Sequence, residues 1–183
     1  MLSPDQLALL QRLSGQMTGY AYALIHDRDR ALDLVQDAIL RAMEARRAPV
    51  DAPAFRVWFT RIVRNLWIDG FRAERRRAET VVGSADDLAE PAARFDTEDV
   101  ILNRMVVRHA FFELSADHRD VLALVDIAGF SYDEAAQTLE INRGTVMSRV
   151  SRARQQLLCK LGDGQAGGQV VPFPLARRGG RHG

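Results

Sequence analysis

The side chains best suited to a chemical task lie near the C-terminal end of the chain, on one face of a predicted helix. They combine arginines and hydroxyl groups with a glycine at the helix start: Arg143, Gly144, Thr145, Ser148, Arg149 and Arg152. Arginine pairs bidentately with guanine in the major groove, and serine or threonine contacts bases or phosphates. Amides near Gly144 and Thr145, at a helix N-terminus, can hold a phosphate. The pattern predicts docking on double-stranded DNA, although an ordinary helical hairpin with solvated arginines has similar spacing.

A helix-turn-helix over residues 131–157 would position that face. Gly129 predicts the end of one helix, and Ser131 followed by Glu134 has the spacing of a capping box, which starts another. The inward positions of the two helices carry small or aliphatic residues: Ala135, Ala136, Leu139, Val146, Val150, Ala153 and Leu157. The alanines are small enough for the helices to cross closely.

A second basic group follows one stripe of a helix predicted over residues 55–77. Its members are Arg61, Arg64, Asn65, Arg72, Arg75 and Arg76. Such a stripe can follow a phosphate backbone, with a salt-dependent affinity. Aromatic side chains beside it could stack on unpaired bases. Trp58 and Phe59, however, lie on the apolar side of the helix, so we expect them in the core.

A third group combines acidic side chains with an aliphatic one. Asp33, Gln36, Asp37, Leu40 and Glu44 follow the spacing of one helix face. An exposed leucine among acids suits a partner helix. The alternative is a solvated acidic face with Leu40 turned inward.

Composition excludes several classes of function. No apolar run approaches the roughly 20 residues of a membrane span, and the N-terminus lacks the pattern of a secretory signal. A single cysteine, Cys159, excludes an internal disulfide and favours a cytoplasmic location. The four histidines are scattered, and no paired carboxylates or activated nucleophile stand out. We therefore expect no metal, no cofactor, no membrane insertion and no enzymatic activity.

The predicted fold is all-α, with two small helical domains joined by a flexible acidic linker. The first domain covers residues 1–78, with two helices that meet near residues 26–29, a proline-containing loop over 48–54 and a long helix. The linker covers 79–98. The second domain covers 99–161 and ends in the helix-turn-helix, and a glycine-rich tail over 162–183 is expected to be disordered. Residues 56–77 are strongly basic, whereas residues 79–99 are acidic. This asymmetry of charge, rather than the net charge of +1, is the clue to the partners of the protein.

Three segments resemble bacterial sigma factors of the extracytoplasmic function (ECF) type, in the sigma-70 family. Residues 114–161 resemble region 4, from the Leu-Ser-Ala-Asp-His-Arg run through Gly-Phe-Ser-Tyr-Asp-Glu-Ala-Ala to Gly-Thr-Val-Met-Ser-Arg-Val-Ser-Arg-Ala-Arg. Residues 31–41 resemble region 2.2, and residues 55–69 resemble regions 2.3 and 2.4. One departure is Glu140, in a turn where relatives often carry glycine. A non-glycine residue at positive φ is uncommon, so the turn is expected either to differ slightly or to be mildly strained.

The resemblance implies a function and a set of partners. The protein would be an alternative sigma factor that binds core RNA polymerase, at the β′ clamp helices and the β flap, and recognises promoter DNA. The basic face over residues 143–152 would read the minus 35 element. The basic stripe over residues 61–76, together with Phe55, would read the minus 10 element. Asp33, Gln36, Asp37 and Leu40 would bind the polymerase, and the loop over 48–55 would hold a flipped base. An anti-sigma factor is the expected regulator.

Two other functions fit parts of the pattern. A sigma-like decoy would sequester an anti-sigma factor without engaging promoters, but it would not need arginines in both basic groups. A conventional helix-turn-helix regulator would use the C-terminal segment alone, which would make the region 2.2 motif a coincidence.

Overall fold

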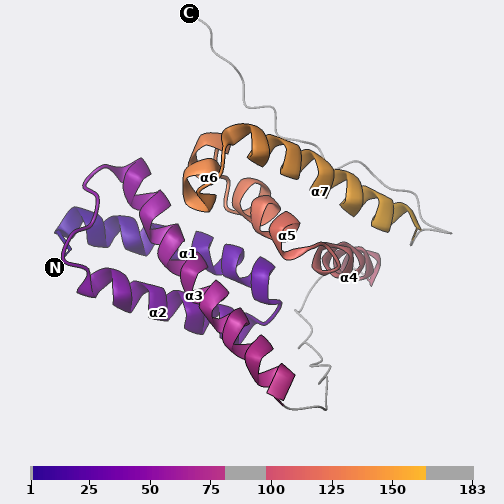
Figure 1. The fold of residues 1–183 in the computed structure, drawn as a ribbon, viewed down its shortest axis with the longest axis horizontal. Helices are drawn as coiled ribbons and strands as arrows, with labels where there is room; N and C mark the ends of the chain where they lie inside the picture. The colour runs from indigo at the N-terminus through magenta and orange to yellow at the C-terminus, as the bar shows by residue number, and fades with distance from the viewer. Residues whose placement is uncertain (1, 81–97, 164–183) are drawn as a thin grey trace, which may run out of the picture.

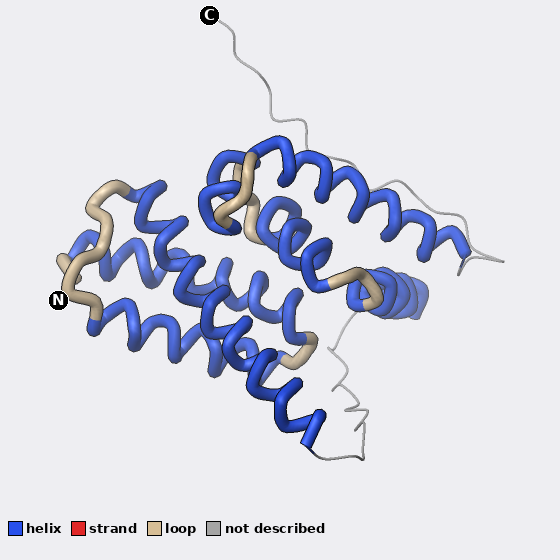
Figure 2. The backbone as a smooth tube through the Cα atoms, in the orientation of Figure 1, coloured by secondary structure: helices blue, strands red, loops and turns tan. Residues whose placement is uncertain are grey.

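The computed structural model describes residues 2–80 and 98–163, and within these ranges the regular structure is helical (Figures 1 and 2). The all-α prediction is confirmed. Most of the predicted linker and tail lies outside the described residues. The exact domain boundaries therefore stay predictions. Within the described ranges, no helix is both long enough and apolar enough to cross a membrane.

Three helices form an N-terminal bundle: α1 (Pro4–Ile25), α2 (Arg28–Glu44) and α3 (Ala52–Thr80). The predicted junction near residues 26–29 is confirmed. α1 ends at His26, which adopts a left-handed conformation with φ of 65°, and Asp27 then caps α2 by accepting a hydrogen bond from the Arg30 amide at 3.0 Å. Large side chains fill the bundle core with no exposed surface: Met17, Tyr20, Phe55, Phe59 and Val63.

The loop before α3 is shorter than predicted. α3 begins at Ala52, so the prediction that the loop runs to residue 54 was wrong. Asp51 caps the helix, because its carboxylate accepts a hydrogen bond from the Ala54 amide at 3.1 Å. Pro53 lies in the first turn, where its missing N–H breaks no helical hydrogen bond. Gln6 of α1 holds the loop by donating to the carbonyl of Pro49 at 2.9 Å.

The C-terminal unit consists of α4 (Glu98–Phe112), α5 (Ala116–Leu122), the π-helical segment η1 (Ala123–Ile127), α6 (Tyr132–Leu139) and α7 (Arg143–Asp163). Gly129, with φ of 64°, ends the first helical run. The predicted capping box is confirmed: the Ser131 hydroxyl accepts from the Glu134 amide at 3.2 Å, and the Glu134 carboxylate accepts from the Ser131 amide at 2.8 Å. This box satisfies two backbone donors at the start of α6.

The N-terminal bundle and the C-terminal unit pack against each other. α3 contacts α6, and α1 contacts η1 and α5 (Figure 1). Near the end of α1, His26 stacks on Phe112 of α4 with ring centroids 3.8 Å apart, and Arg108 donates to the Tyr22 hydroxyl at 3.2 Å. We call this placement the closed arrangement.

The capping box gives a stability prediction. Ser131→Ala should lower the free energy of unfolding by about 0.5 to 2 kcal/mol, because the Glu134 amide loses its acceptor at the start of α6. Denaturant unfolding monitored by circular dichroism measures the loss. Ser151→Ala, at an exposed site inside α7, is the matched control and should be nearly neutral. Equal stability of both variants would show that the box contributes nothing.

Candidate nucleic-acid interface

The outward face of α7 carries the predicted minus 35 residues. Val146, Val150 and Ala153 are at most 1% exposed and face the rest of the C-terminal unit. The predicted DNA-binding residues lie on the other side. Among these, Arg143, Gly144, Ser148 and Arg152 are exposed, while Thr145 and Arg149 are half-buried. The predicted division of α7 into a buried and an outward face is confirmed.

Acidic neighbours hold two of these arginines. Arg149 forms an ion pair with Asp117 of α5 at 3.0 Å, and Arg143 forms one with Asp133 of α6 at 3.1 Å. Both carboxylates are well exposed, so each pair contributes little to stability and yields readily to a stronger anion. In this structure the two carboxylates orient the guanidinium groups.

The backbone at the start of α7 bears on the predicted phosphate site. The Thr145 amide donates to the Asn142 carbonyl at 2.9 Å, which also accepts from the Val146 amide at 3.1 Å. The Thr145 amide is thus engaged within the chain, and the binding of a phosphate by the amides near Gly144 and Thr145 stays a prediction. The Thr145 side chain lines an open hollow between α7, α6 and α3.

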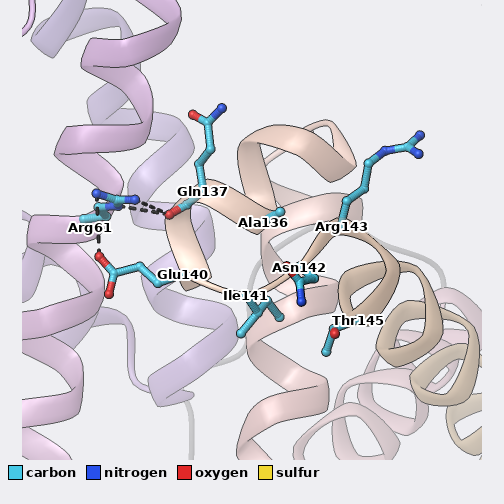
Figure 3. Close-up of a pocket in the computed structure, with 8 residues that line it drawn as sticks. All are labelled: Arg61, Ala136, Gln137, Glu140, Ile141, Asn142, Arg143 and Thr145. Atoms are coloured by element: carbon cyan, nitrogen blue, oxygen red, sulfur yellow. Dashed lines mark hydrogen bonds and ion pairs between the residues drawn. The ribbon is translucent and has the colours of Figure 1, made fainter.

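Arg61 of α3 reaches across that hollow to the C-terminal unit (Figure 3). Its Nε donates to the Gln137 carbonyl at 3.1 Å, and its Nη1 lies 3.7 Å from the Glu140 carboxylate. Arg143 points away from Arg61 in the same view. Glu140 adopts a left-handed conformation with φ of 57°, so the turn keeps the backbone that glycine favours and does not differ at this residue. A predicted minus 10 residue is therefore bound to the turn of the helix-turn-helix.

Arg64 contacts a buried carboxylate of the C-terminal unit. Its Nε lies 2.6 Å from Asp120 Oδ2, and the Tyr20 hydroxyl donates to Asp120 Oδ1 at 2.6 Å. Burial raises the pKa of Asp120, while the charge of Arg64 and the hydrogen bonds from Tyr20 and Arg64 oppose that rise. Burial, reinforced by the Asp120 carboxylate, raises the pKa of Tyr20 well above its usual value. Sequence reasoning missed Tyr20 and Asp120, which carry no motif and stand 100 residues apart.

Arg56 is a third arginine of α3 that crosses to the C-terminal unit. Its guanidinium lies 4.0 Å from the centroid of the Phe130 ring and 3.3 Å from the Glu134 carboxylate, and it also donates to the Ala128 carbonyl. The sequence placed Arg56 in the region 2.3 motif without giving it a role. Its flanking residue Phe55 is wholly buried and packs on Trp58, with ring centroids 5.2 Å apart. The assignment of Phe55 to DNA binding was therefore wrong, because its ring belongs to the bundle core.

The rest of the predicted minus 10 stripe lies further along α3. Asn65, Arg72 and Arg76 are exposed, and the Arg75 side chain lies outside the described part of the chain. Trp67 and Phe71 line a crevice beside Arg64 and Arg72, and Phe71 is 49% exposed. Phe59 is fully buried, as predicted. Among the aromatic residues of α3, the exposed ring is therefore that of Phe71. The sequence analysis did not assign Phe71 to the site.

The acidic face of α2 is exposed along its whole length. Asp33, Gln36 and Asp37 are exposed, and Leu40 is 59% exposed. The alternative in which Leu40 turns inward is therefore wrong. Met43, 49% exposed, extends the apolar part of this face. α2 lies on the side of the bundle away from α6 and α7 (Figure 1).

Two solved structures share this fold. The sigma factor RpoE of Bartonella quintana, solved in complex with the anti-sigma factor NepR, is 28% identical, with a TM-score of 0.65 over 86% of this chain and 94% of that one. CnrH, solved with the cytosolic domain of CnrY, is 24% identical, with a TM-score of 0.63 over 87% of this chain and 89% of that one. The second likeness concerns the fold alone.

Family and sequence comparisons agree with that likeness. Residues 9–77 match the family Sigma-70 region 2, and residues 104–157 match Sigma-70, region 4. The ECF RNA polymerase sigma factor EcfG of Rhodopseudomonas palustris is 34% identical over 77% of this chain and 76% of its own length. The ECF RNA polymerase sigma factor SigL of Mycobacterium tuberculosis is 34% identical over 82% of this chain and 85% of its own length. With both family regions present in order and relatives of this similarity, the chain belongs to the ECF-type sigma factors of the sigma-70 family.

Proposed function

We propose that this sigma factor binds core RNA polymerase through α2 and reads promoters at two places, the minus 10 element through α3 and the minus 35 element through α7. The observation that carries the proposal is the outward face of α7, where Ser148, Arg149 and Arg152 project from a helix whose other side is fully buried. That is the geometry of a recognition helix in the major groove. Two DNA-reading units on one chain gain affinity through effective concentration.

The proposed minus 10 surface is a revised version of the predicted stripe. It keeps the polar members, Arg61, Arg64, Asn65, Arg72, Arg75 and Arg76, and leaves out the buried Phe55. Phe71 beside Arg72 supplies an aromatic surface on which an unpaired base can stack. The loop before α3 remains the proposed holder of a flipped base. Val50 in that loop is 89% exposed and is available for such a contact.

The polymerase surface is the exposed face of α2 defined by Asp33, Gln36, Asp37 and Leu40. Acids around an exposed leucine suit a basic partner helix with an apolar stripe, such as the β′ clamp helices. The β flap is the proposed partner of the C-terminal unit. An anti-sigma factor is a further proposed partner, supported by the Bartonella quintana relative that was solved with one.

Transcription by purified core polymerase, with and without this protein, on a library of promoter fragments tests the function. We expect initiation at specific fragments only when the protein is present. If the protein binds DNA but adds no promoter-specific initiation, the proposed function fails and the protein is a conventional helix-turn-helix regulator. If the protein neither binds DNA nor supports promoter-specific initiation, but does capture an anti-sigma factor, it is a sigma-like decoy.

Arg149→Ala tests the recognition helix. The variant should bind minus 35 DNA more weakly by about 1 to 3 kcal/mol if the side chain reads a base. Fluorescence anisotropy of the holoenzyme on a selected promoter measures the change. Arg154→Ala is the control on the same helix, because Arg154 is held by Asp126 through Nε at 3.2 Å and is not part of the proposed face. Equal affinities of Arg149→Ala and the parent protein would remove Arg149 from the site.

Asp37→Lys tests the polymerase surface. Charge reversal at the centre of the α2 face should weaken binding to core polymerase about tenfold or more, since a favourable charge contact becomes repulsive. Biolayer interferometry with immobilised core measures the dissociation constant. Asp5→Lys, at an exposed site on α1, makes the same charge change elsewhere and should bind normally. Full affinity of Asp37→Lys would refute this surface.

A further inference from the structure

We propose that Gln6 of α1 is a positioning residue for base selection at the minus 10 element, because its carboxamide fixes the loop before α3. The inference rests on the proposed function, since it takes that loop as the holder of a flipped base. The loop covers residues 45–51, between the end of α2 and the start of α3. Gln6 lies outside every segment assigned to DNA binding, and it acts on the base only through the loop.

The Gln6 side chain uses both ends of its carboxamide. The residue is 8% exposed. Its Oε1 accepts a hydrogen bond from the Ser3 amide at 2.8 Å, within the capping box that starts α1. Its Nε2 donates to the Pro49 carbonyl at 2.9 Å and to the Ala48 carbonyl at 3.3 Å. Because the Ser3 amide can only donate, the carboxamide oxygen must face Ser3 and the nitrogen must face the loop.

These contacts fix the backbone of the loop rather than its side chains. Both acceptors are carbonyls, 42 and 43 residues from Gln6 along the chain. Ala48 and Pro49 are half-buried, whereas the next residue, Val50, is 89% exposed. Figure 2 shows the loop beside the start of α1. With two successive carbonyls bound to α1, the chain presents Val50 outward.

A second anchor holds the loop on the other side of Val50. The Asp51 carboxylate accepts from the Ala54 amide at 3.1 Å, and the Asp51 carbonyl accepts from the Phe55 amide at 2.8 Å. Val50 therefore lies between one anchor on α1 and one on α3. Arg46 and Arg47, earlier in the loop, are exposed. Their charges suit the phosphates on either side of an extruded base.

A pocket for an extruded base distinguishes one base from another only if its walls keep one conformation. Extrusion costs the energy of unpairing and unstacking, and contacts within the pocket offset that cost. A loop with several conformers makes those contacts in only a fraction of the molecules. Without the two donors of Gln6, the carbonyls of Ala48 and Pro49 lose their contact with α1. Selection among bases should then weaken, while the surfaces on α2 and α7 stay unchanged.

Two substitutions of Gln6 remove the anchor. Gln6→Glu has the same shape and keeps an acceptor for the Ser3 amide, but the ionised carboxylate has no donor for the loop carbonyls. Gln6→Met has a similar length and removes both kinds of contact.

Two controls separate the anchor from charge and from helix stability. Gln11→Glu makes the same charge change at an exposed site on the same helix. Ser3→Ala removes the hydroxyl that accepts from the Gln6 amide at 3.3 Å, so it weakens the start of α1 without removing a contact to the loop. Thermal unfolding verifies that each variant is folded.

The first measurement is hydrogen–deuterium exchange of the free, full-length protein. We expect faster deuterium uptake in peptides that cover residues 45–55 for both Gln6 variants, because a segment with fewer contacts opens more often. Both controls should remain near the parent protein in these peptides. Parent-like uptake in the Gln6 variants would show that Gln6 does not anchor the loop, and would overturn the proposal.

The second measurement is base selection by the reconstituted holoenzyme. The template is a promoter library with a constant minus 35 element and a randomised minus 10 element, and the transcripts are sequenced. At one position of the minus 10 element, the preference for the favoured base should fall about fivefold or more in both Gln6 variants, the lower end of what one mismatched base costs. An equal fall in Ser3→Ala or Gln11→Glu would reduce the effect to helix stability or charge and would refute the role of Gln6.

The outcomes distinguish this inference from the function on which it rests. If the parent protein initiates at no promoter in the library, the proposed function fails. If the parent initiates selectively and the Gln6 variants select the same bases as strongly, the proposed function stands and the role of Gln6 fails.

Discussion

The buried carboxylate of Asp120 is the constraint on which the closed arrangement depends. Removing a carboxylate from water is costly unless donors replace the water. Here the donors are Tyr20 of α1 and Arg64 of α3, so a side chain of the C-terminal unit is satisfied only by the N-terminal bundle. Burial raises the pKa of Asp120, and Arg64 favours its ionised form. One desolvated group and its two partners therefore link the two units, beside the contacts of Arg56, Arg61 and His26.

The side chains of α3 fall into three groups with different surroundings, and the helical period places these groups on different faces of the helix. Phe55, Phe59 and Val63 are turned into the bundle core with no exposed surface. Arg56, Arg61 and Arg64 project toward the C-terminal unit. Asn65 and Arg72 remain exposed further along the helix. Because a guanidinium binds carboxylate and phosphate with the same donors, the middle group suits an internal acid and a DNA backbone equally well. Competition between the two follows from that shared chemistry.

The faces of α2 and α7 stay outside this competition. The α2 face combines acids with two neighbouring apolar side chains, Leu40 and Met43, which are 59% and 49% exposed. The α7 face presents arginines held by weak, exposed ion pairs with Asp117 and Asp133.

The sequence by itself determined the features that depend on residues within about one helical turn of each other. The capping box of Ser131 and Glu134 and the buried side of α7 both follow from local spacing. Phe55 was misassigned, since being part of a motif does not tell whether a ring faces inward. The contact of Asp120 with Tyr20 and Arg64 was decided only by the tertiary structure. Its partners lie 100 and 56 residues away, and burial of a charge is a property of the packed units rather than of any segment.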